Sequence, residues 1–202
     1  MKETVSQKVR DRIVHGKFGE IFFVSSFPKY DVEYTTKLLS LFEKEGLITR
    51  IAKGVYAKVK KTRFGILYPS VYELVEQIAK RDKAKVIPTG ETAANRLGFS
   101  TQIPMNTTFL TSGSPRKLIL NGRTITLKHG APKNFAYKNK LIAELVQALR
   151  SIGEYNITPE NKDTITKIFT NIQNSDIVEH DLFLAPFWIQ KLIKKNNLKN
   201  NE

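Results

Sequence analysis

The feature that most constrains the fold is a helix-to-hairpin stretch between Asp31 and Tyr56. Asp31 can accept a hydrogen bond from a free amide at the start of a helix, so it is a candidate N-cap. Gly46 is expected to end the helix, because glycine readily takes the left-handed conformation found just past a helix end. Between them, core-type side chains recur every three or four residues and therefore share one helical face. These are Thr35, Leu38, Leu39 and Phe42.

A hairpin is predicted directly after this helix, because residues 47–51 and 55–57 are β-prone runs around a turn that contains Gly54. Three shorter elements are predicted before the helix: a helix over 4–15, a strand over 19–24 and a brief helix or turn over 25–29. This order of elements is typical of a winged helix-turn-helix. We therefore expect residues 1–60 to form such a domain, with the long helix in a DNA groove and the hairpin as the wing.

The remainder, residues 61–202, is expected to be an α+β domain with a small, mostly antiparallel sheet and C-terminal helices. Helices are predicted over 70–80, 90–97, 138–152, 159–172 and 186–195, and the tail 196–202 is expected to fray. Strands are predicted over 84–88, 107–111, 117–120 and 124–128. Asn121 and Gly122 between the last two strands are a strong two-residue hairpin signal.

The charge of the chain indicates a polyanionic partner. Its net charge is +14 at pH 7, and most of this excess lies before residue 136. A protein this basic attracts nucleic acid, and the partner should meet the first two thirds of the chain. The basic joint over residues 58–63 has two interpretations, a solvated linker or a segment that tracks phosphates.

The composition also indicates the cellular compartment in which the protein is expected. The chain has no cysteine, which excludes disulfides and thiolate metal sites and favours a reducing compartment. We find no signal-peptide pattern at the N-terminus and no apolar run of the roughly 20 residues that a membrane helix needs. We therefore expect a cytoplasmic protein without a membrane partner.

Candidate DNA contacts lie on the outer face of the long helix and in the predicted wing. They are Tyr34, Lys37, Ser40, Lys44, Arg50 and Lys53. Point charges suffice for phosphate contacts from a wing, and polar side chains on the helix can reach base edges or the backbone. The alternative is an ordinary solvated face. Glu33, Glu43 and Glu45 count against DNA binding, because carboxylates repel phosphate unless they are paired or turned away.

A second basic face is predicted in the middle of the chain. Its candidate members are Arg96, Arg116, Lys117, Arg123, Lys128, His129 and Lys133. In the strand that contains Thr124 and Thr126, Lys128 points to the same side as these threonines, away from Ile125 and Leu127. This face could meet DNA beyond the wing or an RNA, or it could be an ordinary polar sheet face.

Enzymatic motifs are not evident. The three histidines lie far apart, and we find no metal-ligand spacing, Walker loop or nucleophile elbow. We therefore expect no catalytic residue, metal or cofactor. One alternative from another class stays open, a phosphate-handling enzyme centred on His129 and Lys128.

Three blocks resemble the AbiEi-like antitoxins, the transcriptional half of type IV abortive-infection toxin–antitoxin pairs. Residues 50–56 (RIAKGVY) resemble the family signature R-x-A-R/K-G-x-Y. Residues 90–104 (GETAANRLGFSTQIP) are similar to its block G-x-x-A-A-N-x-L-G-x-S-T-Q-x-P, and residues 127–134 (LKHGAPKN) match a shorter one. Together the matches cover about residues 5 to 153.

This resemblance implies a repressor of its own operon that opposes a nucleotidyltransferase-like toxin, usually without a stable complex. Relatives tend to begin the recognition helix with Ser and Arg, where this chain has Asp31 and Val32, so the operator sequence is expected to differ. Pairing of two copies on an inverted-repeat operator stays open. The alternative function is a winged-helix regulator with an unrelated ligand-sensing or RNA-binding second domain.

Overall fold

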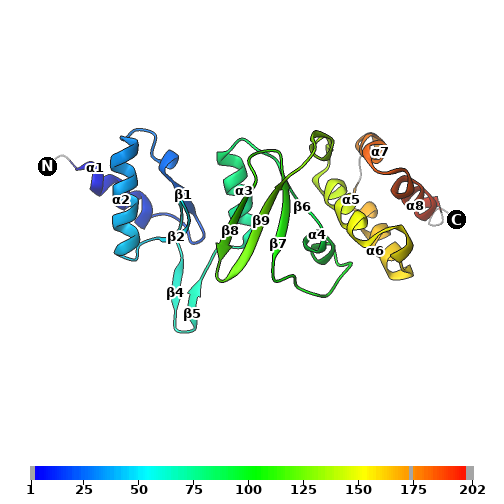
Figure 1. Cartoon of the computed structure of the whole chain (residues 1–202), viewed down its shortest axis with the longest axis horizontal. Coiled ribbons are helices and arrows are strands. Elements are labelled where there is room, and N and C mark those ends of the chain that lie inside the picture. Colours follow the sequence, from blue (N-terminus) through cyan, green and yellow to red (C-terminus); the bar gives the residue numbers. More distant parts are fainter. Residues whose placement is uncertain (1–2, 173–174, 199–202) are drawn as a thin grey trace. The chain divides into compact units, whose positions relative to one another are not determined.

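The computed structural model describes residues 3–172 and 175–198 (Figure 1). The protein belongs to the α+β class, as the sequence predicts. Its backbone divides into two compact units, Met1–Ile78 with Leu118–Arg123, and Ala79–Lys117 with Thr124–Glu202. The predicted domains, 1–60 and 61–202, stay a prediction, and the compact units divide the chain at different residues.

The first unit holds the predicted helix and hairpin. Its elements are α1 (Val5–Val14), β1 (Ile21–Phe23), η1 (Val24–Ser26), α2 (Val32–Lys44), β2 (Thr49–Ala52), β3 (Val55–Ala57), β4 (Lys60–Thr62), β5 (Gly65–Leu67) and most of α3 (Val71–Arg81). Strand β3 lies between β1 and β2 in a three-stranded sheet, and it is antiparallel to both.

The long helix forms for the reasons visible in the sequence. The Asp31 side chain accepts a hydrogen bond from the Tyr34 amide at 2.8 Å, so the predicted N-cap is confirmed. Gly46 has a φ of +76° and ends the helix as predicted. The four predicted core residues of this helix, Thr35, Leu38, Leu39 and Phe42, are all buried.

The predicted hairpin is also confirmed. Arg50 lies opposite Tyr56, and the register shifts by a bulge between Arg50 and Ala52. Gly54 in the turn has a φ of +70°, a conformation that glycine adopts without strain. The helix and the sheet share one core, made of Val9, Ile13, Phe22, Phe27, Leu38, Leu39, Phe42, Ile48 and Tyr56.

Residues 60–62 of the basic joint, for which a solvated linker was one of two interpretations, form a strand. They form β4, which pairs with β5 in a hairpin of its own. The sequence prediction missed this hairpin, because neither strand has an apolar face that alternates with a polar one. All six strand residues are exposed, so no burial pattern marks them.

The second unit combines a sheet with helices. Its further elements are β6 (Val86–Pro88), α4 (Glu91–Arg96), β7 (Thr107–Thr111), β9 (Arg123–His129, all but its first residue), η2 (Pro132–Phe135), α5 (Lys140–Ile152), η3 (Glu154–Asn156), α6 (Pro159–Thr170), α7 (Ser175–Leu184) and α8 (Phe187–Leu198). Strand β8 (Arg116–Leu120) begins in this unit, and its last three residues are grouped with the first unit.

The sheet of these strands is mixed, because it contains a parallel pair as well as the antiparallel pairing expected from the sequence. The strand order is β6-β7-β9-β8, so β9 lies between β7 and β8 although it follows both in the chain. Strand β6 pairs antiparallel with β7, whereas β7 and β9 are parallel, with Thr107 opposite Ile125. The Asn121–Gly122 turn is confirmed, since both residues have a positive φ.

A helical core follows the sheet, and its buried side chains come mainly from α5, α6, α7 and α8. They are Ile142, Leu145, Val146, Leu149, Ile165, Phe169, Leu182, Ala185, Ile189 and Ile193. The sequence prediction missed α7, because the polar Asp181 lies among its inward-facing positions and the apolar Phe183 is exposed. Its fully buried Asp181 instead accepts hydrogen bonds from the Lys138 and Asn139 amides, at 2.9 and 2.7 Å.

The C-terminal tail and the question of a membrane-spanning helix are two further points on which the sequence gives an expectation. Residues 199–202 of the tail that was expected to fray lie outside the described residues, and residues 196–198 are the end of α8. Within the described part of the chain, no helix combines the length and the apolar character needed to cross a membrane.

The core position of Phe42 gives a first testable prediction. Its side chain is 1% exposed, so Phe42→Ala should lower the free energy of unfolding by about 3–5 kcal/mol. Leu41→Ala, at a neighbouring position that is 45% exposed, is the control and should cost under about 1 kcal/mol. Urea unfolding followed by circular dichroism measures both. Equal effects of the two substitutions would contradict the helix phase described above.

Candidate nucleic-acid interface

A polar stripe runs along the outer face of α2. Glu33, Lys37, Ser40 and Lys44 follow one another at spacings of three or four residues, which places them on one side of a helix. Lys37 and Lys44 are exposed, and Ser40 is half-buried. Tyr34 lies beside this stripe and is also exposed.

One contact joins this stripe to the hairpin. The Ser40 hydroxyl lies 3.4 Å from the hydroxyl of Tyr56, a buried residue of β3. Arg50 of β2 is directly opposite Tyr56, and opposite residues of an antiparallel pair point to the same face of a sheet. Arg50 therefore lies on the same sheet face as Tyr56, which is the face that α2 covers. Its side chain is exposed, because it lies at the open edge of that face. The cationic hairpin and the helix stripe thus border each other.

Three cations at this border are not neutralised. Lys44, Arg50 and Lys53 are exposed, and no ion pair engages them within residues 3–172 and 175–195. Lys53 lies at the turn of the hairpin, next to Gly54. Such side chains are free to meet phosphate groups.

The carboxylates of this region are largely paired. Glu33 lies 2.7 Å from the Lys37 ammonium, and Glu45 forms an ion pair with Arg10, whose guanidinium also covers the Phe42 ring at 5.2 Å. Glu43 is half-buried. Two of the three acids that count against DNA binding are therefore balanced by a neighbouring cation, although the Glu33 pair also occupies Lys37.

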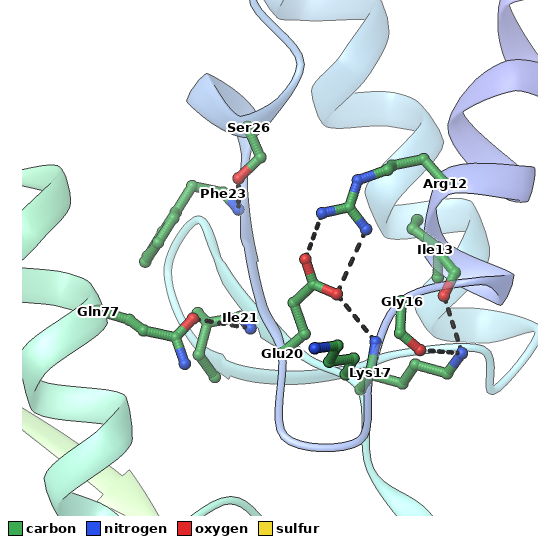
Figure 2. Close-up of polar contacts among 10 residues, drawn as sticks. Arg12, Ile13, Gly16, Lys17, Glu20, Ile21, Phe23, Ser26 and Gln77 are labelled. Carbon is green, nitrogen blue, oxygen red and sulfur yellow. Dashed lines mark hydrogen bonds and ion pairs between the residues drawn. The ribbon is translucent and has the colours of Figure 1, made fainter.

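A polar network at the end of α1 fixes the position of the sheet (Figure 2). Figure 2 shows the Glu20 carboxylate between the Arg12 guanidinium and the Lys17 amide, from which it accepts a hydrogen bond at 3.0 Å. The hydrogen bond from Arg12 lowers the pKa of Glu20, so this pair stays charged well below neutral pH. The Gln77 side chain of α3 accepts a hydrogen bond from the Ile21 amide at 3.1 Å.

Lys58, the first residue of the basic joint, also has a structural role. Its ammonium donates to the carbonyls of Ile13, Val14 and Gly16, at 3.0 Å for Ile13 and 2.9 Å for Gly16. A cation at this place satisfies carbonyls that lack partners at the end of a helix. Lys58 therefore belongs to the scaffold rather than to a phosphate site.

A hollow of about 470 Å³ lies beside this network. It is lined by Arg12, His15, Lys17, Phe18, Gly19, Glu20, Glu73 and Gln77. Its main charged pair, Arg12 and Glu20, is already satisfied internally. No group of three metal-ligating side chains occurs anywhere in the described part of the chain.

The candidates for the second basic face differ in their surroundings, because some are paired with carboxylates and others are exposed. Arg116 forms an ion pair with Asp82 at 2.6 Å, and Arg96 lies 3.5 Å from the buried Glu144. Arg123 belongs to the first compact unit, unlike the other candidates. Four candidates of the second unit are exposed cations or imidazoles, namely Lys117, Lys128, His129 and Lys133. The His129 ring nitrogen Nδ1 lies 3.5 Å from the Gly113 carbonyl oxygen.

The sequence prediction also missed a buried polar chain in the second unit. The Thr89 hydroxyl donates to the Gln147 side chain at 3.1 Å, which in turn donates to Asn134 at 3.2 Å. Arg150 donates to the same Asn134 oxygen at 3.3 Å. These contacts join α5 to the loops around residues 89 and 134. Such a network has no periodic signal in the sequence, because its members come from three separate segments.

The chain belongs to a family of unknown function, DUF6088, which it matches over residues 8–177. The matched range includes both the helix-to-hairpin stretch and the sheet of the second unit. No curated protein and no solved structure matches the chain.

Glu144 gives a prediction for the pH dependence of stability. Burial raises the pKa of this carboxyl from 4.5 to about 7, and the neighbouring Arg96 opposes the shift. The folded chain therefore binds this proton more tightly than the unfolded chain, and the free energy of unfolding should fall as pH rises from 4.5 to 7. The loss attributable to this group should be on the order of 3 kcal/mol.

Glu144→Gln should remove this slope and should be more stable than the original chain at pH 8. Chemical unfolding at several pH values between 4 and 8 measures the difference, and Glu91→Gln, at an exposed position of α4, is the control. Parallel profiles for the original chain and Glu144→Gln would contradict a buried, proton-binding Glu144.

Proposed function

We propose that the first unit is a winged helix-turn-helix that binds double-stranded DNA, with α2 as the recognition helix and the β2–β3 hairpin as the wing. The observation that supports this most directly is the contact between Ser40 and Tyr56, with Arg50 opposite Tyr56. It holds the polar stripe of α2 beside the cationic hairpin, so one duplex can touch both.

The order of the elements supports the same proposal. Helix α1, strand β1, the short η1, helix α2 and the β2–β3 hairpin follow one another as in a winged helix, and β1 completes the sheet beside β3. On this proposal, Arg50, Lys53 and Lys44 contact phosphates, while Tyr34, Lys37 and Ser40 face the groove.

We further propose that the protein represses its own operon and acts as the antitoxin to a nucleotidyltransferase-like toxin in the cytoplasm. This part rests on the resemblance of residues 50–56, 90–104 and 127–134 to AbiEi-like antitoxins. The second unit would then carry the antitoxin activity, without catalysis and without a stable complex with the toxin.

A second candidate function is a winged-helix regulator whose second unit binds RNA. The exposed Lys117, Lys128 and Lys133 favour it, with the exposed imidazole of His129 next to Lys128, since these lysines have no carboxylate partners among the described side chains. An RNA-binding second unit would retain a labelled RNA probe after the wing has been inactivated.

The wing assignment predicts the effect of charge reversal. Arg50→Glu and Lys53→Glu should each weaken binding at least tenfold, for specific and random duplexes alike, because phosphate contacts are independent of sequence. Each should also reduce the slope of log K against log salt by about one. Fluorescence anisotropy with a 40-base-pair duplex from the region upstream of the gene measures both quantities.

Lys167→Glu is the matched control, because it makes the same charge change at an exposed position of α6 in the other unit. Its affinity should stay within about twofold of the original chain, as expected for a phosphate-independent position. Unchanged affinity in the two wing variants would reject the assignment of β2–β3 as a wing.

The antitoxin proposal predicts the result of co-expression. A nucleotidyltransferase-like gene beside this one should arrest growth when expressed alone, and the full chain supplied from an unrelated promoter should restore growth. The unrelated promoter separates antitoxin activity from repression of the operon. Continued arrest in the presence of folded, soluble chain would reject the antitoxin role and leave the regulator.

A further inference from the structure

The β4–β5 hairpin is an isolated two-stranded ribbon in the first unit (Figure 1). Lys60 lies opposite Leu67, Lys61 opposite Ile66, and Thr62 opposite Gly65. All six strand residues are exposed, and no third strand of the described chain pairs with them. A two-stranded hairpin is marginally stable in water by itself, so its persistence needs either a firm base or a partner.

The base of this hairpin is fixed on both sides at Gly19. The Gly19 amide donates to the Lys58 carbonyl at 2.9 Å, just before β4 begins. After β5, the chain passes close to the same glycine, because a Cβ added to Gly19 would lie 3.5 Å from the Cβ of Pro69. Both ends of the hairpin therefore lie beside Gly19, which comes shortly before β1 of the three-stranded sheet, and the rest of the ribbon extends from this base.

The tip of the hairpin presents an arginine and an aromatic ring together. Phe64 is 86% exposed, and the Arg63 guanidinium lies 4.6 Å from the centre of its ring. The turn is held by Thr62, whose hydroxyl donates to the Gly65 carbonyl at 2.9 Å and accepts from the Phe64 amide at 3.2 Å. Gly65 has a φ of +121°, which only glycine adopts readily. The ring is thus displayed by an ordered turn.

The charge of the segment that contains this hairpin favours a polyanion as its binding partner. The sequence from Gly46 to Tyr72 contains no Asp or Glu, and its cations besides the engaged Lys58 are Arg50, Lys53, Lys60, Lys61 and Arg63. A protein surface that binds such a ribbon would have to supply every counter-charge, whereas a nucleic-acid backbone supplies them at regular intervals.

The hairpin is also continuous with the proposed DNA interface. A Cβ added to Gly46, directly after α2, would lie 3.1 Å from the Lys61 ammonium, so the cationic side of β4 lies at the end of the recognition helix. Lys44 belongs to the last turn of the same helix. One row of cations therefore leads from α2 onto the ribbon.

We propose that the β4–β5 hairpin is a second DNA-binding arm, whose tip enters the minor groove beside the site bound by α2. Lys60 and Lys61 contact the phosphate backbone, Arg63 lies in the groove, and Phe64 wedges between base pairs. An apolar side chain at the end of a cationic ribbon is the kind of group that unstacks a base step and bends the duplex. This inference rests on the proposed DNA-binding function and extends the contact surface beyond the wing.

The test uses the full chain and two variants of the tip, Phe64→Ala and Arg63→Gln. Both residues are exposed, so neither substitution should change the melting temperature. The probes are the 40-base-pair upstream duplex and a random duplex of the same length, each carrying a donor and an acceptor dye at its ends. Phe183→Ala, which removes another highly exposed ring from α7, is the matched control.

The original chain and Phe183→Ala should raise energy transfer between the duplex ends, because the wedge bends the DNA. Phe64→Ala should abolish this rise and weaken binding about threefold to tenfold, and Arg63→Gln should lower the salt slope by about one. The minor-groove ligand netropsin should compete with the original chain and with Phe183→Ala, and it should have less effect on Arg63→Gln, which lacks the guanidinium that lies in the groove.

Three results would overturn the proposal, and they are distinguishable. If the original chain binds neither duplex at 50 mM salt, the proposed function and the arm fail together. If Lys53→Glu weakens binding while both tip variants keep the original affinity, salt slope and energy transfer, the assignment of β2–β3 as the wing is kept. The proposal that β4–β5 is a second DNA-binding arm is then wrong. If Phe64→Ala instead converts a dimer to a monomer in sedimentation velocity without a change in DNA bending, the hairpin binds a second copy of the chain.

Discussion

The packing of α2 against the three-stranded sheet is the constraint on which the first unit depends. Leu39, Phe42 and Tyr56 are all buried in one core, so the phase of the helix is fixed by its apolar face. That phase decides which side chains face solvent, and the proximity of Ser40 to Tyr56 shows that the hairpin lies beside them. The proposed interface is the outer side of this core, and any change that rotates α2 would separate the helix cations from those of the wing.

Electrostatics divides the cations of the first unit into two groups. Arg10, Arg12 and Lys58 are engaged with carboxylates or helix-end carbonyls, and they hold the unit together. Lys44 and Arg50 have no such partners among the described residues, and they are the cations that a phosphate backbone can reach. Net charge alone could not make this distinction, because it counts both groups equally.

The sequence predicted what local signals encode. The N-cap Asp31, the terminating Gly46 and the Asn121–Gly122 turn each specify a backbone geometry at one place, and all three are found there. The exposed β4–β5 hairpin was missed because none of its strand residues is buried, so no apolar pattern marks it. The sequence also did not predict two features that long-range contacts create, helix α7 with its buried Asp181 and the central position of β9. The burial of Asp181 and the position of β9 depend on residues that are far apart in the chain, so no local sequence pattern predicts them. The same reason explains why Lys58 was not recognised as a helix cap.

The central claim is that α2 and the β2–β3 hairpin bind one duplex together, and it can be tested by DNA cleavage from fixed points. The chain contains no cysteine, so Lys37→Cys and Lys53→Cys each create a single attachment site for an iron–EDTA reagent. We expect both derivatives to cut the upstream duplex at positions within about one helical turn, roughly 10 base pairs, of each other. Cleavage from one position only, or cuts separated by several turns, would contradict a joint interface of helix and hairpin.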